Sequence, residues 1–212
     1  MTMTILFQGD SITDCGRTTC GGAGYNSKGL GPGYPCLIAS RLACDYPQMD
    51  LQFINLGISG HRIVDLYARW KADCINLKPD VVSILIGIND TWHEVVRQNG
   101  VEVPRYARFY RELITWTKEC LPNVTFVLMD PFLCPDLPDR ASFVDDVAAR
   151  DKVVADLAAE FGCIHIPLQE VFNDAFKRAP QEYWAADGVH PTPAGHQLIT
   201  DAWIKATKHL FK

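Results

Sequence analysis

The sequence predicts an α/β protein, a single-domain three-layer αβα sandwich built on about five parallel strands. Short apolar runs typical of strands alternate with longer segments in which apolar residues recur at helical spacing. Such alternation favours right-handed crossovers and a parallel sheet with helices on both faces. Glycine turns at Gly9, Gly57 and Gly87 each follow an apolar run, so we expect them together at the carboxyl ends of the strands, where such folds place their sites.

The strands are predicted from apolar runs that stop at glycine or proline. Residues 81–86 are nearly all apolar and β-branched, the pattern of a central strand covered on both faces. The first strand ends at the turn formed by residues 9–11. Further strands are predicted at 51–56, 124–129 and 163–166.

The helices are predicted where apolar residues repeat every three or four positions. The last begins at Thr192 and Pro193, a cap followed by a first-turn proline, and extends to about residue 210. The others are expected at residues 34–46, 62–77, 103–121, 144–161 and 168–178.

Composition indicates an ordinary globular chain. It has 212 residues, of which 48% are hydrophobic and 21% charged, without repeats or a linker, so one domain is expected over residues 1–212. A net charge of −5 and the lack of a basic stripe argue against nucleic acid as a partner. No run is long enough to span a membrane and the start lacks a basic segment, so we expect a cytoplasmic protein. The sequence leaves homo-oligomerisation open.

The eight cysteines show no Cys-x-x-Cys pair, so we expect reduced, mostly buried thiols and no metal site. Cys15 and Cys20 flank the loop after Ser11, and their oxidation is left open. The glycine-dense loop at 16–33 lacks the Gly-Lys-Ser/Thr of a phosphate-binding loop. An αβα fold also permits a flavin- or nucleotide-binding module, but this absence disfavours it and no cofactor is expected.

Ser11 is the first candidate for chemistry. It follows a strand in a Gly-Asp-Ser turn, which presents its hydroxyl at the end of the sheet, where a following helix would direct its N-terminal dipole. The alternative is that Ser11 only caps that helix.

Asp187 and His190 complete a candidate relay with Ser11. Three residues apart in a loop, they allow the carboxylate to bind one imidazole nitrogen while the other points away, as a serine nucleophile requires. No acidic residue stands three positions away from His61, His165, His196 or His209, and His93 is not expected to be the base either.

An acyl-transfer site also needs hydrogen-bond donors for the developing oxyanion. The backbone N–H groups of Ser11 and Gly57 and the side-chain amide of Asn89 are candidates on the same predicted edge of the sheet. An Asn in a turn is also a common Asx-turn former, and this alternative stays open for Asn89.

Four motifs together resemble the SGNH (GDSL-type) hydrolase family. They are Gly-Asp-Ser at 9–11, Gly57, Gly-x-Asn-Asp at 87–90 and Asp-x-x-His at 187–190. Longer matches at 9–17, 57–60, 86–90 and 189–196 resemble its acetylxylan-esterase-like branch. Residues 18–28 match no pattern of that family.

The resemblance implies a flavodoxin-like fold and a serine hydrolase. Ser11 would be the nucleophile and His190 the base oriented by Asp187, while Ser11, Gly57 and Asn89 would form the oxyanion hole.

The expected function is a serine esterase that removes short acyl groups, acetyl above all, from carbohydrate such as acetylated xylan or xylo-oligosaccharides. A thioesterase or lysophospholipase acting on longer chains is the main alternative, and a non-catalytic carbohydrate-binding protein is another. Trp92 and Trp184 are expected near the edge of the site, as platforms for sugar rings. The alternative for both is core packing.

Overall fold

The sheet is parallel and has five strands in the order β2-β1-β3-β4-β5, as the sequence predicts. The computed structural model describes residues 2–18, 27–137 and 140–211. Within them the strands are β1 (Thr2–Gly9), β2 (Asp50–Asn55), β3 (Val81–Leu85), β4 (Thr125–Met129) and β5 (Ile164–Ile166).

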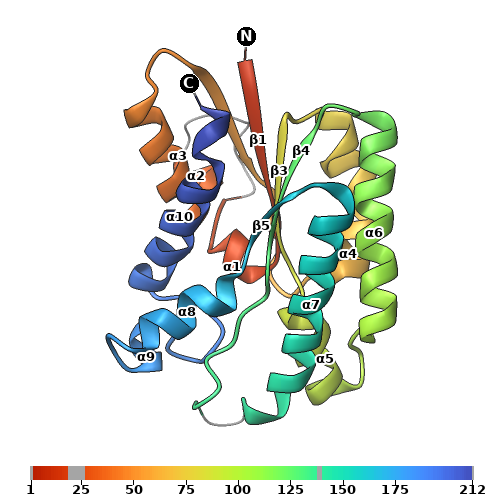
Figure 1. The fold of residues 1–212 in the computed structure, drawn as a ribbon, viewed down its shortest axis with the longest axis vertical. Coiled ribbons are helices and arrows are strands. Elements are labelled where there is room, and N and C mark those ends of the chain that lie inside the picture. Colours follow the sequence, from red (N-terminus) through yellow and green to blue (C-terminus); the bar gives the residue numbers. More distant parts are fainter. Residues whose placement is uncertain (1, 19–26, 138–139, 212) are drawn as a thin grey trace.

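Helices cover both faces of this sheet, so the three-layer sandwich is confirmed. The α-helices are α1 (Ser11–Asp14), α2 (Ser27–Leu30), α3 (Tyr34–Asp45), α4 (Ile63–Asp73), α5 (Ile88–Arg97), α6 (Val103–Cys120), α7 (Val144–Phe161), α8 (Leu168–Phe176), α9 (Gln181–Trp184) and α10 (Pro193–Thr207). Short 3-10 helices follow α4, precede α7 and follow α10: η1 (Ile75–Leu77), η2 (Ala141–Phe143) and η3 (Lys208–Leu210). Helices α3, α8 and α10 lie on one side of the sheet and α4, α6 and α7 on the other (Figure 1).

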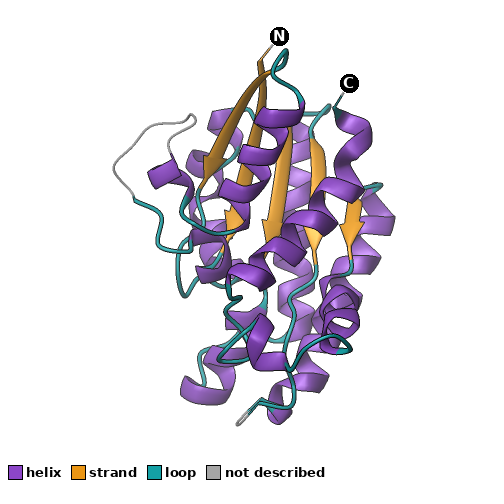
Figure 2. Cartoon of the chain, turned by 90° about the vertical axis from the view of Figure 1, so that its left-hand side faces the viewer, coloured by secondary structure: helices purple, strands orange, loops and turns teal. Residues whose placement is uncertain are grey.

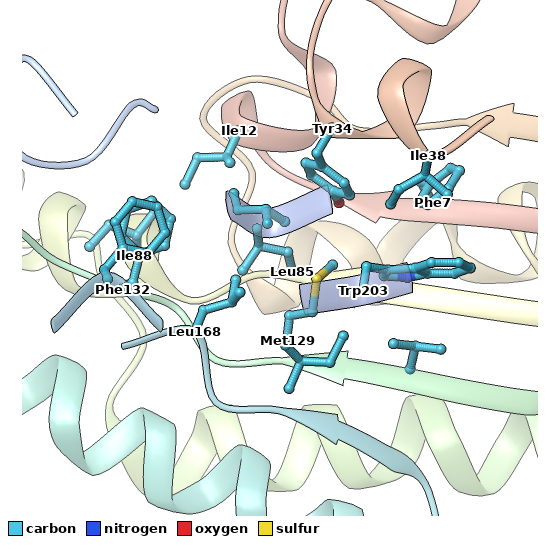
Figure 3. Packing of buried hydrophobic residues seen from close by; sticks show 14 of the residues in the cluster. Phe7, Ile12, Tyr34, Ile38, Leu85, Ile88, Met129, Phe132, Leu168 and Trp203 are labelled. Carbon is cyan, nitrogen blue, oxygen red and sulfur yellow. The ribbon is translucent and has the colours of Figure 1, made fainter. Parts of the chain in front are cut away.

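Large aromatic side chains fix the first helical layer to the sheet (Figure 3). Phe7 of β1 lies with its ring centroid 5.8 Å from that of Tyr34 in α3 and 6.1 Å from that of Trp203 in α10. The Trp203 indole N–H donates to Ser83 Oγ in β3 at 3.0 Å. Burial of each large apolar side chain contributes about 1.5–3 kcal/mol, so α3 and α10 are held firmly over β1 and β3.

Helix α5 was not predicted from the sequence. Ile88, Trp92, Val95 and Val96 do recur at helical spacing, but the helix begins within residues 87–90, which the sequence pattern indicates as a glycine turn. The helix begins directly after Gly87, whose φ of 138° permits the sharp departure from β3.

The carboxyl ends of the central strands lie level with one another. Gly9 at the end of β1 pairs with Leu85 of β3, and Phe7 pairs with Asn55 of β2. Figure 2 shows the strand arrows pointing to the same end of the sheet. The segments after β1, β2 and β3 therefore meet at this edge. No helix in the described ranges is both long and apolar enough to cross a bilayer.

Candidate active site

Ser11 begins the short helix α1 directly after β1. Asp10 caps this helix, since its Oδ1 accepts the Ile12 N–H at 3.0 Å. A Cβ on Gly9 would lie 2.4 Å from the Leu85 carbonyl oxygen, so only glycine allows β1 to approach β3 this closely. This local packing fixes the position from which Ser11 leaves the sheet.

The structure brings Ser11, His190 and Asp187 together in a continuous hydrogen-bonded chain. Ser11 Oγ lies 2.7 Å from His190 Nε2, and His190 Nδ1 lies 2.6 Å from Asp187 Oδ2. The other carboxylate oxygen of Asp187 accepts the backbone N–H groups of His190 at 2.7 Å and Val189 at 3.0 Å. The carboxylate thus fixes both the ring and the loop that carries it, the geometry in which an imidazole accepts a serine proton.

The pKa shifts of Asp187 and His190 favour general-base chemistry. Partial burial opposes ionisation of Asp187, but hydrogen bonds from the His190 ring and from two backbone N–H groups outweigh it and hold the pKa of Asp187 well below its usual range. The hydrogen bond to Asp187 raises the pKa of His190 despite partial burial of the ring. Asp187 therefore stays charged and stabilises the imidazolium that forms when Ser11 loses its proton.

Asp10 is a second carboxyl beside the relay, and its place in the Gly-Asp-Ser turn does not by itself indicate a role. Burial raises its pKa to about 7, although the Ile12 hydrogen bond and the nearby His190 oppose the shift. Its Oδ2 is buried without a hydrogen-bond partner in the described part of the chain. Near neutral pH a fraction of the molecules therefore holds Asp10 as the uncharged acid.

A cavity of about 330 Å³ opens over Ser11 Oγ. One wall comes from the loop after β2 and the other from two turns of α5, with the relay histidine at one end. Its lining residues are Ser11, Ser59, Gly60, Asn89, Trp92, His93, Val96, Arg97 and His190. This volume is at the small end of ligand pockets, so it suits a short acyl group better than a long one.

Asn89 reaches the cavity because the start of α5 is anchored. The neighbouring Asp90 carboxylate accepts the Ile63 N–H of α4 at 3.1 Å, and buried Arg150 donates to Thr91 Oγ1 at 2.9 Å. One hydrogen of Asn89 Nδ2 binds the His61 carbonyl oxygen at 3.2 Å. The amide is thus a fixed donor group and the second hydrogen remains for a ligand.

Gly57 does not offer its N–H to the cavity, which corrects the expected third donor. That N–H donates to Asn55 Oδ1 at 2.9 Å, and the residue is buried so tightly that a Cβ would lie 2.4 Å from Asp14 N. Gly60, three residues on, lines the cavity, and its N–H makes no hydrogen bond with any described residue. Gly60, with φ at +83°, is therefore the candidate glycine donor at this site.

The two tryptophans have different environments. Trp92 lines the cavity, and its ring centroid lies 6.2 Å from that of His190. Trp184 is only 7% exposed and packs in the hydrophobic core, with its indole N–H on the Ala179 carbonyl oxygen. Trp184 thus presents no ring face to a substrate, and core packing explains it.

Two other histidines have structural contacts. His196 in α10 accepts the Tyr34 N–H on Nδ1 and lies 3.3 Å from Cys15 Sγ through Nε2, and burial lowers its pKa to about 4. His165 in β5 binds Asp130 at 2.7 Å. The seven cysteines that the structure describes are free thiols, whereas Cys20 and most of the loop at 18–28 lie outside the described residues.

The chain is similar to a known esterase. An acetylxylan esterase from Geobacillus stearothermophilus is 35% identical over 205 residues, which cover 95% of this chain and 92% of that esterase. Its solved structure superimposes with a TM-score of 0.85, covering 96% of this chain and 93% of that one. Two further structures of that esterase are catalytic mutants, one with a serine and one with a histidine replaced by alanine.

A second solved structure and a family model match most of the chain. A GDSL-like lipase family protein of Parabacteroides merdae is 38% identical, with a TM-score of 0.94 and coverage of 97% of this chain and 95% of the other. The model of the GDSL-like Lipase/Acylhydrolase family matches residues 7–198. With the fold and the serine turn described above, these matches show that the chain belongs to the GDSL-like lipase/acylhydrolase family.

Proposed function

We propose that this protein is a serine esterase that removes acetyl groups from carbohydrate, with acetylated xylo-oligosaccharides as the substrate class. The observation that carries the proposal is the chain from Ser11 Oγ through His190 to Asp187, with bonds of 2.7 and 2.6 Å, at the floor of a small open cavity. The similarity to an acetylxylan esterase supports the choice of acyl group and acceptor.

In the first half-reaction Ser11 Oγ attacks the ester carbonyl carbon while His190 Nε2 takes the hydroxyl proton. The tetrahedral intermediate collapses when His190 returns that proton to the sugar oxygen, which leaves as an alcohol. The acetyl group then remains on Ser11. In the second half-reaction His190 deprotonates a water molecule, which attacks the acetyl-enzyme carbonyl, and His190 then returns the proton to Ser11 Oγ as acetate leaves.

The oxyanion of both intermediates would be bound by three donors. They are the backbone N–H groups of Ser11 and Gly60 and the free hydrogen of Asn89 Nδ2. The Ser11 N–H makes no hydrogen bond with any described residue. Preorganised donors of this kind stabilise charge that develops only in the transition state.

The cavity supports a short acyl group and a sugar acceptor. The cavity is small, and an acyl chain too long for it loses roughly 1–3 kcal/mol for each methylene that does not fit. Trp92 supplies an aromatic face on the α5 wall. Sugar rings stack on such faces with their apolar C–H groups while their hydroxyls stay hydrated.

The test compares hydrolysis of acetyl and octanoyl aryl esters and of acetylated xylo-oligosaccharides by the purified protein and by Ser11→Ala. We expect steep preference for acetyl, release of acetate from the oligosaccharide, and loss of both activities in Ser11→Ala. Equal rates on acetyl and octanoyl esters would instead indicate a hydrolase of longer acyl chains. Binding of the oligosaccharide without acetate release would indicate a carbohydrate-binding protein.

A further inference from the structure

Arg140 connects three segments around the relay without lining the cavity. It lies just before η2, half-buried, and its Nε donates to the Asp187 carbonyl oxygen at 2.9 Å. Its guanidinium carbon lies 4.3 Å from the ring centroid of Trp92 and 5.4 Å from that of Phe143. One side chain thus touches the loop of the relay acid, the cavity wall of α5 and the turn before α7.

The loop at 187–190 is shaped to receive this side chain. Gly188 adopts φ of +86°, and a Cβ there would lie 3.0 Å from Arg140 Cγ. The aliphatic stem of Arg140 therefore packs where any other residue at position 188 would place a side chain. The backbone turn that brings the side chains of Asp187 and His190 together therefore packs against this arginine.

Trp92 contacts both Arg140 and the relay. Its ring centroid lies 6.2 Å from that of His190 and 5.9 Å from that of Phe143. The Arg140 guanidinium covers the Trp92 ring, so this ring lies beside both the arginine and the relay histidine. A planar guanidinium both stacks on an aromatic face and donates in its own plane, and an ammonium cannot do both.

We propose that Arg140 is a positioning residue of the esterase, which fixes the Asp187 backbone and the Trp92 ring relative to each other and so holds His190 in line with Ser11 Oγ. This inference rests on the proposed function, because its kinetic readouts assume that the relay hydrolyses esters. Arg140 also acts on the relay through its charge, which opposes protonation of His190.

The charge of Arg140 should also affect the pH dependence of the hydrolysis rate. Titratable and charged groups around His190 are Asp187 on its own loop, Asp10 after β1, Arg140 before η2, His196 in α10, and His93 and Arg97 across the cavity in α5. Asp187 and Asp10 raise the pKa of His190, whereas Arg140 lowers it. Removal of the Arg140 charge should therefore move the acid limb of the rate profile to higher pH.

The experiment compares Arg140→Met, Arg140→Lys and a matched control, Arg178→Met. Arg178 also covers a tryptophan, with its guanidinium carbon 4.9 Å from the Trp184 centroid, but it belongs to no part of the relay. Arg140→Met keeps most of the stem and should lose on the order of 10-fold in kcat on a small aryl acetate with KM nearly unchanged, since small misplacements of catalytic groups are costly. Its acid limb should move upward. Arg140→Lys should keep the limb but not the full kcat, and Arg178→Met should match the wild type in both.

A wild-type kcat and an unmoved acid limb in a folded Arg140→Met protein would overturn the inference, as would the same losses in Arg178→Met. If Arg140→Met does not fold, Arg140→Lys decides alone, with wild-type kcat as the contradicting result. Titration of the His190 ring by NMR in substrate-free protein separates the two proposals. Hydrolysis retained by Ser11→Ala would contradict the proposed function, while the effect of Arg140 on the His190 titration would still be measured.

Discussion

Asp187 controls the protonation of His190 more than any other group in the site. Its hydrogen bond and charge raise the pKa of His190, and the reactive form of His190 is the neutral ring. The rate of ester hydrolysis should therefore rise with pH through a midpoint above the usual histidine value of about 6.5.

Replacement of Asp187 should change both the rate and this midpoint. Asp187→Asn removes the charge that stabilises the imidazolium and offers an amide N–H to the wrong tautomer, so kcat should fall on the order of 10²–10⁴-fold. The acid limb should move to lower pH because the main cause of the raised pKa is gone. Initial rates from pH 5 to 9 would show this, and an unchanged midpoint would exclude Asp187 as the partner of the base.

Asn89 should act on the transition state alone. Asn89 lines the cavity, and one hydrogen of its amide binds the His61 carbonyl oxygen, which leaves the other for the oxyanion. Asn89→Ala should reduce kcat by on the order of 10²–10³-fold with KM little changed. Steady-state kinetics decide the point, since an increase in KM at constant kcat would make Asn89 a ground-state binding residue.

The loop after β2 shows why one residue of the site was placed wrongly. Gly57 and Gly60 lie in the same short segment, and both positions are compatible with a glycine donor. The choice depends on where the Asn55 side chain binds: it accepts the Gly57 N–H and donates to the carbonyl oxygens of Thr13 and Leu30. These contacts join segments far apart in the sequence, so no local pattern reveals them.

Helices α5 and α9 carry the two tryptophans, and their different environments predict different mutant phenotypes. Trp92→Phe should lower the ratio of kcat/KM for acetylated xylo-oligosaccharide over aryl acetate, because the sugar loses part of its platform. A loss of about 1–2 kcal/mol of contact corresponds to roughly 5–30-fold. Because both substrates use the same relay, any effect of the substitution on the relay cancels in this ratio.

Trp184→Phe supplies the matched control for this measurement. It removes a core contact and the hydrogen bond to Ala179, so the free energy of unfolding should fall by about 1–3 kcal/mol while the substrate ratio stays constant. A change in the ratio for Trp184→Phe, or none for Trp92→Phe, would contradict the assigned environments.

The strands and most long helices were predictable because each is encoded by its own periodicity. The helix expected at 62–77 occurs as α4 and η1, and the one expected at 144–161 occurs as α7. Helix α5 was missed because its first residues, 88–90, directly follow Gly87 and have the composition of a turn. Arg140 and Arg150 were missed for another reason: each acts through partners more than 45 residues away along the chain.

The stability of the whole molecule should depend on the neutral state of His196. Burial lowers its pKa from 6.5 to about 4, so between these values the unfolded chain binds a proton that the folded chain does not. This contribution, about 3 kcal/mol, is fully present above pH 6.5 and is lost as the pH falls towards 4. Buried carboxyls with raised pKa values, such as Asp10 and Asp90, act in the opposite direction throughout this range.

A comparison with His196→Gln isolates the histidine from those carboxyls. The difference in free energy of unfolding between wild type and variant should shrink as the pH is lowered from about 6.5 to 4, measured by urea denaturation at several pH values. A difference that stays constant with pH would show that His196 is not held neutral by the fold.

The most direct test of the relay is covalent labelling by an organophosphate ester, read out by peptide mass spectrometry. Only a serine activated by its base reacts rapidly with such a reagent. Wild type should carry the label on Ser11 and lose esterase activity in proportion, whereas His190→Ala should label far more slowly and Ser11→Ala not at all. A label on any other serine, or full ester hydrolysis by protein that resists labelling, would contradict Ser11 as the nucleophile.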